Sequence, residues 1–406
     1  MQFRSQSAIS QRIGQPRCRK PIVADCLHIP FHGAAVSRQQ GSGLMSEPDV
    51  NTSADQAESA PEPRLREPLW QRFVVGCLGF AIWVVSILPQ WLAYLIGDLI
   101  AVPWFLYWSV FDFRGRRSSG YWRNTRIAFR EGTQLGATRP KNHLWRWSRH
   151  IGWTVIDSCR MPRINKHNMA DHVELGDYGP VEKLFAEGNG LIFATGHVGS
   201  WDISGVLAAL LGLPITSVFR PTPLPALNRL ITHMRSRTGQ VMIARKNVMW
   251  TLKKVLRDKQ AIGILADGGA KHSAVVAPFL GAAARSVATP ALLHLATGAP
   301  ICVVAFLRVG RQRYRLRVYD IIRDMDTGDR EQDLIAITTR CNRALGVAIK
   351  EVPEQWFWQG RRFRHRPAGE VPDAEGLPPL VSMDSTEHLD NPIGRHRSPK
   401  KQKTTG

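Results

Sequence analysis

The residues best suited to chemistry lie in one short stretch, where a largely apolar run ends at a glycine and a histidine follows. Residues 191–195 predict a strand, and His197 comes directly after Gly196. Asp202 lies five positions after His197, across the expected loop and helix start. An imidazole in this place can remove a proton from a hydroxyl group if a carboxylate holds its other ring nitrogen. We therefore predict His197 as a general base and Asp202 as the carboxylate that orients it.

The same spacing also fits a structural pair of histidine and carboxylate, and the stretch alone leaves both interpretations open. The sequence has no serine in a Gly-x-Ser-x-Gly turn and no cysteine in a recognisable nucleophile setting. A catalytic His197 would therefore activate a hydroxyl group of the substrate. No second set of ligands accompanies the histidine, which argues against a metal site.

Charge and cysteine content limit the partners and the compartment. The 406 residues carry a net charge of +21, which favours an anionic partner such as a membrane surface, a nucleic acid or an acidic protein. The six cysteines are scattered and form no Cys-x-x-Cys pair, so neither a zinc site nor a disulfide framework is indicated. A reducing, cytoplasmic setting fits this pattern.

Composition divides the chain into four parts. Residues 1–68 predict a disordered basic extension and linker, for which either Met1 or Met45 is the start. Residues 69–113 are a hydrophobic, membrane-associating helical segment, and residues 114–367 are expected to form the catalytic domain. Residues 368–406 return to proline, glycine and charge and predict a disordered basic tail.

The hydrophobic segment predicts a membrane anchor. Residues 73–88 carry no charge, Pro89 interrupts the run, and 91–110 continue it with Asp98 as the only charged residue. A helix that crosses a bilayer needs about 20 apolar residues, so a spanning helix, an interfacial hairpin and a hairpin buried in the core remain open. Basic residues on both flanks predict that both ends face the cytoplasm.

The rest of the chain predicts an α/β fold. Residues 120–160 have helical spacing, and an alternation of strands and helices begins near residue 180. This alternation predicts a central, mostly parallel or mixed sheet that is covered by helices, with a site at the carboxyl ends of the strands. The expected strands are 191–195, 215–219, 241–244, 261–265, 275–279, 301–307 and 313–319, and the expected helices are 180–187, 202–211, 225–238, 247–258, 286–298 and 332–350.

Several blocks follow the histidine in a specific order. The first block, 196–202, has the pattern HxxxxD, and the second, 218–221, contains Arg220 and precedes Asn228, Arg235 and Gly239. Later blocks are 266–268 with 277–281, then 297–301, and finally 353–358 with Arg361, Arg362, Phe363 and Arg364. Together they resemble the lipid A biosynthesis lauroyl and myristoyl acyltransferase family, within the lysophospholipid acyltransferase superfamily. The likeness runs from about Leu69 to Arg366.

This resemblance implies a glycerol-phosphate acyltransferase-like fold on the cytoplasmic face of the bacterial inner membrane. It implies a fatty acyl thioester of acyl carrier protein or coenzyme A as donor, no other cofactor, and a lipid A precursor as acceptor. Acyl transfer would be direct, without a covalent acyl-enzyme. The oxyanion would meet backbone N–H groups of the glycine-rich turn or Arg220, whose counterpart is thought to engage the acceptor's phosphate.

The predicted substrate-binding residues each have a structural alternative. Arg220 could be a surface arginine, and Asp267 could hold Arg220 or an acceptor hydroxyl, or cap the turn that follows it. Residues 278–281 would shape the acyl pocket or belong to the core. The arginines at 361, 362, 364 and 366 would receive an acidic carrier protein or lipid headgroups. The full set of substrate-binding candidates is Arg220, Asp267, Gly199, Gly268, Phe279 and Gly281.

Three departures from the family pattern leave the acceptor open. Asp202 stands where the lipid A enzymes often have glutamate, Ser200 where asparagine is common, and Gly268 where glutamine is usual. Related mycobacterial mannoside acyltransferases have aspartate, so another glycolipid or a lysophospholipid is the alternative acceptor. A membrane scaffold of the same fold without catalysis is a further alternative. Nucleic acid is not expected as a partner, because no recognised binding motif accompanies the charge.

Overall fold

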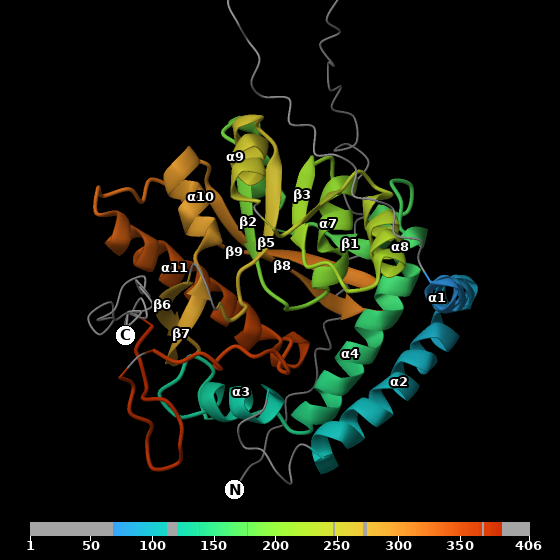
Figure 1. Ribbon diagram of the computed structural model, residues 1–406, viewed down its shortest axis with the longest axis horizontal. Helices are drawn as coiled ribbons and strands as arrows, with labels where there is room; N and C mark the ends of the chain where they lie inside the picture. Colours follow the sequence, from blue (N-terminus) through green and yellow to red (C-terminus); the bar gives the residue numbers. More distant parts are fainter. Residues whose placement is uncertain are drawn as a thin grey trace, which may run out of the picture. The chain divides into compact units, whose positions relative to one another are not determined.

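The computed structural model describes residues 68–383 except 112–119, 138, 177, 247, 271–273 and 368 (Figure 1). The predictions for residues 1–67 and for the tail beyond residue 383 lie outside the described residues. The predicted α/β class, with a mostly parallel central sheet, is confirmed.

The hydrophobic segment forms two separate helices. Helix α1 (Leu69–Ile87) and helix α2 (Gln90–Leu106) flank Pro89, and the π-helical turn η2 (Tyr107–Phe111) follows. Pro68 and Pro89 each precede the first helical residue, where the missing N–H of proline costs no helical hydrogen bond. By length and composition, Leu69–Ile87 and the continuous stretch Gln90–Val110, which joins α2 to η2, could each cross a membrane. No residue of α1 is buried, whereas α2 buries one face.

That face of α2 packs closely along helix α4 (His143–Arg160), as Figure 1 shows. Gly97 and Gly152 permit the approach, since a Cβ atom on Gly152 would lie only 2.1 Å from the carbonyl oxygen of Gly97. Beside them, Asp98 accepts hydrogen bonds from Arg149 Nε at 2.9 Å and from Trp153 Nε1 at 2.7 Å. The hairpin of α1 and α2 is therefore anchored along one side of α4.

The predicted helical region 120–160 is interrupted. Helix α3 (Gly120–Ala128) and α4 are separate, because Gly132 and Gly136 have positive φ angles of 78° and 74° in the intervening loop. After α4 come the 3₁₀ turn η3 (Met161–Arg163), α5 (Met169–His172), strand β1 (Val173–Glu174) and α6 (Tyr178–Ala186).

The central sheet has seven strands in the order β1-β9-β8-β2-β5-β3-β4. Every neighbouring pair is parallel except β8 with β9. The strands are β2 (Leu191–Thr195), β3 (Ile215–Phe219), β4 (Val241–Ala244), β5 (Ala261–Leu265), β8 (Ile301–Gly310) and β9 (Arg313–Ile322), besides β1. The helices between and after them are α7 (Trp201–Leu210), α8 (Pro225–Ser236), α9 (Met249–Arg257), α10 (Thr289–Thr297) and α11 (Arg330–Glu351), which the 3₁₀ turn η4 (Pro353–Gln355) follows.

A second, two-stranded antiparallel sheet lies outside the central one. It consists of β6 (Ala274–Phe279) and β7 (Ala282–Val287), and it contacts α11. The expected helix 286–298 begins later, at Thr289, because residues 282–287 pair with β6 instead.

Alternation along β2 explains why helices cover both faces of the sheet. Ile192 and Ala194 belong to a core cluster that includes side chains of α9, α10 and α11, whereas Leu191 and Phe193 belong to another with α6 and α7. Because both faces are buried, the strand sequence is almost continuously apolar. This burial holds the end of β2, and with it His197, in a fixed place.

The ordered chain continues past the predicted domain boundary at residue 367. Leu377 is buried, and the N–H of Val381 donates to the carbonyl of Gly281 at 3.0 Å. Arg130 Nη2 donates to the carbonyl of Pro378 at 2.8 Å. Residues 369–383, which composition assigns to the tail, therefore contact the loop after α3 and the turn between β6 and β7.

Candidate active site

His197 is held by one buried carboxylate, that of Asp267. The ring Nδ1 lies 2.8 Å from Asp267 Oδ1, and the backbone N–H of His197 donates to Oδ2 at 2.8 Å. The His197 side chain is 32% exposed and that of Asp267 only 3%. The imidazole is thus fixed from behind, while part of its surface stays open to a substrate.

The sheet register brings these two residues together. Strands β2 and β5 are parallel neighbours in which Thr195 pairs with Leu265. His197 and Asp267 each follow two positions later, so they leave the sheet side by side at its carboxyl edge. Trp356 Nε1 donates to Asp267 Oδ2 at 2.7 Å and completes the shell of donors around this carboxylate.

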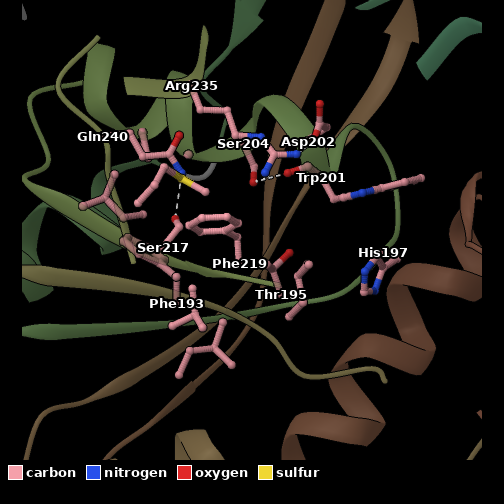
Figure 2. A pocket seen from close by; sticks show the side chains of 18 of the residues that line it. Phe193, Thr195, His197, Trp201, Asp202, Ser204, Ser217, Phe219, Arg235 and Gln240 are labelled. Carbon is pink, nitrogen blue, oxygen red and sulfur yellow. Dashed lines mark hydrogen bonds and ion pairs between the residues drawn. The ribbon is translucent and has the colours of Figure 1, made fainter. Parts of the chain in front are cut away.

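The prediction that Asp202 pairs with His197 is wrong, because the carboxylate beside the ring is that of Asp267. Asp202 lies in the first turn of α7, where it accepts hydrogen bonds from Ser158 Oγ and from the Arg235 guanidinium. Figure 2 shows His197 apart from Asp202, which lies beside Arg235. The helix that begins at Trp201 carries Asp202 toward α4 and α8, and Asp267 takes the place that the sequence interpretation gave to Asp202.

Burial and charge act in opposite directions on this pair. Burial by itself lowers the pKa of His197, but the charge and the hydrogen bond of Asp267 outweigh it and raise that pKa above its usual 6.5. Burial by itself raises the pKa of Asp267, but the His197 ring and the donated hydrogen bonds outweigh it and lower that pKa. The pair therefore favours a charged carboxylate that stabilises an imidazolium.

Aromatic rings limit the space around the imidazole. The ring centroid of Trp201 lies 5.7 Å from that of His197, and the ring centroid of Phe357, which follows η4, lies 5.6 Å from it. Because Asp267 occupies Nδ1, Nε2 is the ring nitrogen that is left to accept a proton from a substrate. These contacts give His197 the geometry of a general base.

His197 lines a cavity of about 1270 Å³. Ligand pockets usually enclose about 300–1,000 Å³, so this one can take a large ligand. Much of its wall is apolar and comes from both core clusters, including Phe193, Ala208, Leu213, Ile215, Leu252 and Leu292. A long hydrocarbon chain would suit this lining.

Arginines contribute the positive charge of the cavity wall. Arg220 and Arg245 both line it, and they follow Phe219 and Ala244, which are partners in the parallel pair β3–β4. The two arginines are therefore neighbours at the carboxyl edge of the sheet. Within the described part of the chain neither has an acidic partner, whereas Arg235 on the same wall is paired with Asp202. This wall is suited to an anionic group such as a phosphate.

Comparison with known proteins gives the family. A model of the family described as bacterial lipid A biosynthesis acyltransferase matches residues 71–365, which include most of α1, all of α2 and the residues around His197. The chain belongs to that family.

Two relatives of this family member have curated names. A phosphatidylinositol mannoside acyltransferase of Mycolicibacterium smegmatis is 25% identical over 204 residues, which are 49% of this chain and 65% of the relative. A lipid A biosynthesis acyltransferase of Haemophilus influenzae is 28% identical over 195 residues, which are 47% of this chain and 58% of the relative. The chain thus spans less than two thirds of the length of either relative.

Three backbone N–H groups in the glycine-rich turn of this family member are engaged within the protein. The N–H of Gly199 donates to the carbonyl of Gln355 at 3.0 Å, and the N–H of Ser200 donates to the carbonyl of Phe306 at 2.7 Å. The N–H of His197 is bound to Asp267. These three N–H groups are therefore not free to bind an oxyanion, whereas Arg220 lines the cavity.

The predicted glycines differ in their surroundings. Gly199 has a φ of 66°, and a Cβ atom there would lie 2.2 Å from the carbonyl oxygen of Phe306. A Cβ atom on Gly268 would meet no atom within 4 Å. Gly199 is therefore required by the backbone of the turn, and Gly268 leaves open space beside Asp267.

Residues predicted to shape the acyl pocket lie outside the cavity. Phe279 is fully buried, with its ring packed against those of Trp356 and Phe363. Gly281 turns the chain between β6 and β7 with a φ of 85°. Neither residue belongs to the cavity wall, so the structure places both in the core of the β6–β7 sheet.

The closing arginine cluster is only partly a surface. Arg362 is 1% exposed and donates to the carbonyl of Arg285 and to Ser286 Oγ, while Arg366 pairs with Glu370. Arg361 and Arg364 remain exposed. The predicted landing surface is therefore reduced to these two residues.

Sequence reasoning did not recognise the roles of Trp356 and Arg245. Trp356 lies in the closing block, far along the chain from Asp267, and only the fold brings its indole to that carboxylate. Arg245 comes directly after an expected strand, and Arg220 comes directly after another. This shared position at the ends of two strands was the signal that could have identified Arg245. The described residues contain no group of three or more His, Cys, Asp or Glu side chains that could hold a metal ion.

Proposed function

We propose that the protein is an acyltransferase that moves a fatty acyl group from a thioester of acyl carrier protein or coenzyme A to a hydroxyl group of a lipid A precursor. One observation carries this proposal: Asp267 holds His197 at the wall of a large, mostly apolar cavity. Membership of the lipid A acyltransferase family supports the reaction class and the acceptor.

The proposed reaction is direct transfer. Nε2 of His197 removes the proton of the acceptor hydroxyl, and the oxygen attacks the thioester carbonyl carbon. Asp267 stabilises the imidazolium that forms. When the C–S bond breaks, the imidazolium returns its proton to the departing sulfur, so the products are an ester and a thiol. No residue carries the acyl group at any step.

In this proposal Asp202 acts at a distance from the proton transfer. Its carboxylate joins Ser158 on α4 to Arg235 on α8, and both Asp202 and Arg235 line the cavity. Asp202 would therefore hold the wall formed by α8 in place. Arg220 and Arg245 would bind a phosphate group of the acceptor or of the donor, because guanidinium groups suit phosphate oxygens.

We further propose that the hairpin of α1 and α2 binds the membrane surface without crossing it. Helix α1 exposes large apolar side chains along its length and contacts α4 and α8, and α2 is packed along α4. Apolar surface of this extent is typical of a membrane-binding site. The net charge of +21 adds attraction to anionic lipids.

Removing exposed tryptophans from the hairpin is expected to weaken membrane binding. Trp83 on α1 and Trp91 at the start of α2 are 55% and 60% exposed. Each Trp→Ser change should lower partition into vesicles of phosphatidylcholine and phosphatidylglycerol by about tenfold, since burying a large apolar side chain contributes about 1.5–3 kcal/mol. Sedimentation of the vesicles with bound protein measures this.

Trp250 on α9 provides the matched control, because it is 72% exposed and lies on another element. Trp250→Ser should leave partition within about twofold of the wild-type value, in line with the small effects of ordinary surface changes. An equal loss for Trp83→Ser and Trp250→Ser would show that the hairpin is not the membrane-binding surface.

Mass spectrometry of membrane lipids tests the proposed acceptor. A strain without this protein should lack one acyl group on a defined fraction of its lipid A, and expression of the wild-type chain should restore it. Expression of the His197→Ala variant should not restore it. Unchanged lipid A in the deletion strain would contradict the acceptor.

The similarity to a phosphatidylinositol mannoside acyltransferase supports a second candidate acceptor. If another glycolipid is the acceptor, the deletion strain should keep its lipid A and lose one acyl group from that glycolipid. A strain in which all lipids keep their acyl groups would contradict both candidates and favour a scaffold without catalysis.

A further inference from the structure

A buried ion pair lies between the hairpin and the catalytic turn. Arg308, near the end of β8, places Nη2 and Nε 2.6 and 2.9 Å from Asp157 Oδ2 on α4, and the two side chains are 5% and 1% exposed. Arg308 also donates to Thr154 Oγ1 at 3.1 Å and to the ring of His150. Buried charges are costly unless they are paired, so this pair fixes β8 against α4.

The hairpin reaches this ion pair through a single hydroxyl group. Tyr94 on α2 is fully buried, and its hydroxyl donates to Asp157 Oδ1, the oxygen that Arg308 leaves free. The same hydroxyl accepts the backbone N–H of Gln312 at 2.6 Å. Tyr94 thus joins α2, α4 and the turn between β8 and β9.

Arg160 fastens the connection between α1 and α2 to the same turn between β8 and β9. Its Nε donates to Gln312 Oε1 at 2.8 Å. Its Nη1 donates to three carbonyl oxygens at 2.7–3.3 Å, those of Val85, Ser86 and Leu88. These carbonyls lie at the carboxyl end of α1, where helical N–H partners are missing and a cation is favourable.

The catalytic turn is bound to the other side of Arg308. The backbone N–H of Arg308 donates to Gln355 Oε1 and its carbonyl accepts from Gln355 Nε2, each at 2.9 Å. The carbonyl of Gln355 in turn accepts the N–H of Gly199 at 3.0 Å. The two residues after Gln355 also contact the catalytic turn and its carboxylate. Trp356 donates to Asp267, and the N–H of Phe357 donates to the carbonyl of His197 at 2.9 Å.

We propose that Tyr94, Asp157, Arg308 and Gln355 are positioning residues that make docking of the hairpin a condition for catalysis. They form one continuous path of hydrogen bonds from α2 to the turn that carries His197. The hairpin therefore does more than hold the enzyme at the membrane, because it also fixes the geometry of the catalytic base. This inference rests on the proposed acyltransferase function.

The variant Tyr94→Phe tests the path by removing one oxygen atom. We expect kcat to fall about three- to thirtyfold, the usual range for coupling through such networks, with KM within about twofold of the wild-type value. The assay uses the purified full chain with lauroyl-coenzyme A and a purified lipid A precursor in detergent micelles. Partition into anionic vesicles, measured on the same preparations, should not change.

Tyr319→Phe is the matched control. Tyr319 is half-buried on β9 and also donates from its hydroxyl to a carboxylate, that of Glu351 at 2.9 Å, but it is no part of this path. It should keep the wild-type kcat. A double-mutant cycle combines Tyr94→Phe with Gln355→Ala. The fold-loss of kcat in the double variant should be smaller than the product of the two single fold-losses, because both changes interrupt one path.

The kinetic and vesicle-binding results together decide the inference. A wild-type kcat for Tyr94→Phe, or a loss of activity that follows a loss of vesicle binding, would overturn the positioning role. If Gln355→Ala does not fold, the comparison of Tyr94→Phe with Tyr319→Phe still decides it. If the wild-type chain transfers no acyl group, the proposed function is overturned. If the wild type transfers acyl groups and the Tyr94→Phe variant has the same kcat, only the positioning role is overturned.

Discussion

Replacing Asp267 with asparagine is expected to lower kcat by roughly 10³- to 10⁴-fold, as loss of the orienting carboxylate does in catalytic triads. Asp267 accepts hydrogen bonds from His197 N, His197 Nδ1 and Trp356 Nε1. An asparagine has one acceptor oxygen and no charge, so it cannot satisfy these donors or stabilise the imidazolium. Steady-state kinetics of acyl transfer measure the effect, and His197→Ala should lose at least as much.

Asp202→Asn is the matched control, since it makes the same chemical change on the carboxylate that the sequence favoured. We expect it to lower kcat by less than about tenfold, because Asp202 contacts Arg235 and Ser158 and not the catalytic base. The hydrogen bonds lost from this charged group contribute about 1.5–3 kcal/mol to the stability of the structure, not to proton transfer. A larger loss for Asp202→Asn than for Asp267→Asn would return the orienting role to Asp202.

The dependence of kcat/KM on pH provides a second readout of the same pair. The base must be neutral to accept a proton, so activity should fall as pH falls through the pKa of His197. Asp267 raises that pKa above 6.5, which places the acidic limb of the wild-type profile above pH 6.5. In Asp267→Asn the charge is gone, and the limb should move to lower pH. An unmoved limb would show that Asp267 does not act on the catalytic base.

Replacing Gly199 with alanine is expected to lower kcat by about 10²-fold or more. A side chain at this position would have to adopt a φ of 66° and place its Cβ atom 2.2 Å from the carbonyl oxygen of Phe306. The turn must therefore shift, and a displacement of about 1 Å at a catalytic group costs about 10²-fold in rate. Acyl transfer assays, together with circular dichroism to verify folding, measure the effect.

Gly268→Ala is the comparison for this change, because an added Cβ atom would meet no atom within 4 Å. It should leave kcat within about threefold of the wild-type value, as for other substitutions into open space. A Gly199→Ala variant with wild-type kcat would contradict the close approach of this turn to β8.

The local pattern of the sequence was sufficient to predict the bounds of several strands and the break in the hydrophobic segment. Each of the strands expected at 191–195, 215–219, 241–244 and 261–265 has those bounds in the structure, because a short apolar run between turn residues specifies its own extent. The break at Pro89 was also readable, since proline limits the helix on either side of it. Strand pairing was less accessible, since the helix expected from residue 286 begins at Thr289 because residues 282–287 pair with β6.

The sequence by itself determined which residue is the candidate base, since His197 ends an apolar strand at a glycine, and it determined the family through the order of its blocks. Only the tertiary structure decided which carboxylate serves that base. The separation of five residues between His197 and Asp202 is short along the chain, but a helix begins between them and turns Asp202 away. Asp267 lies 70 residues after His197, and the parallel register of β2 with β5 brings it to hydrogen-bonding distance of the ring. Spacing along a chain fixes only local geometry, whereas contacts at a sheet edge depend on which strands become neighbours.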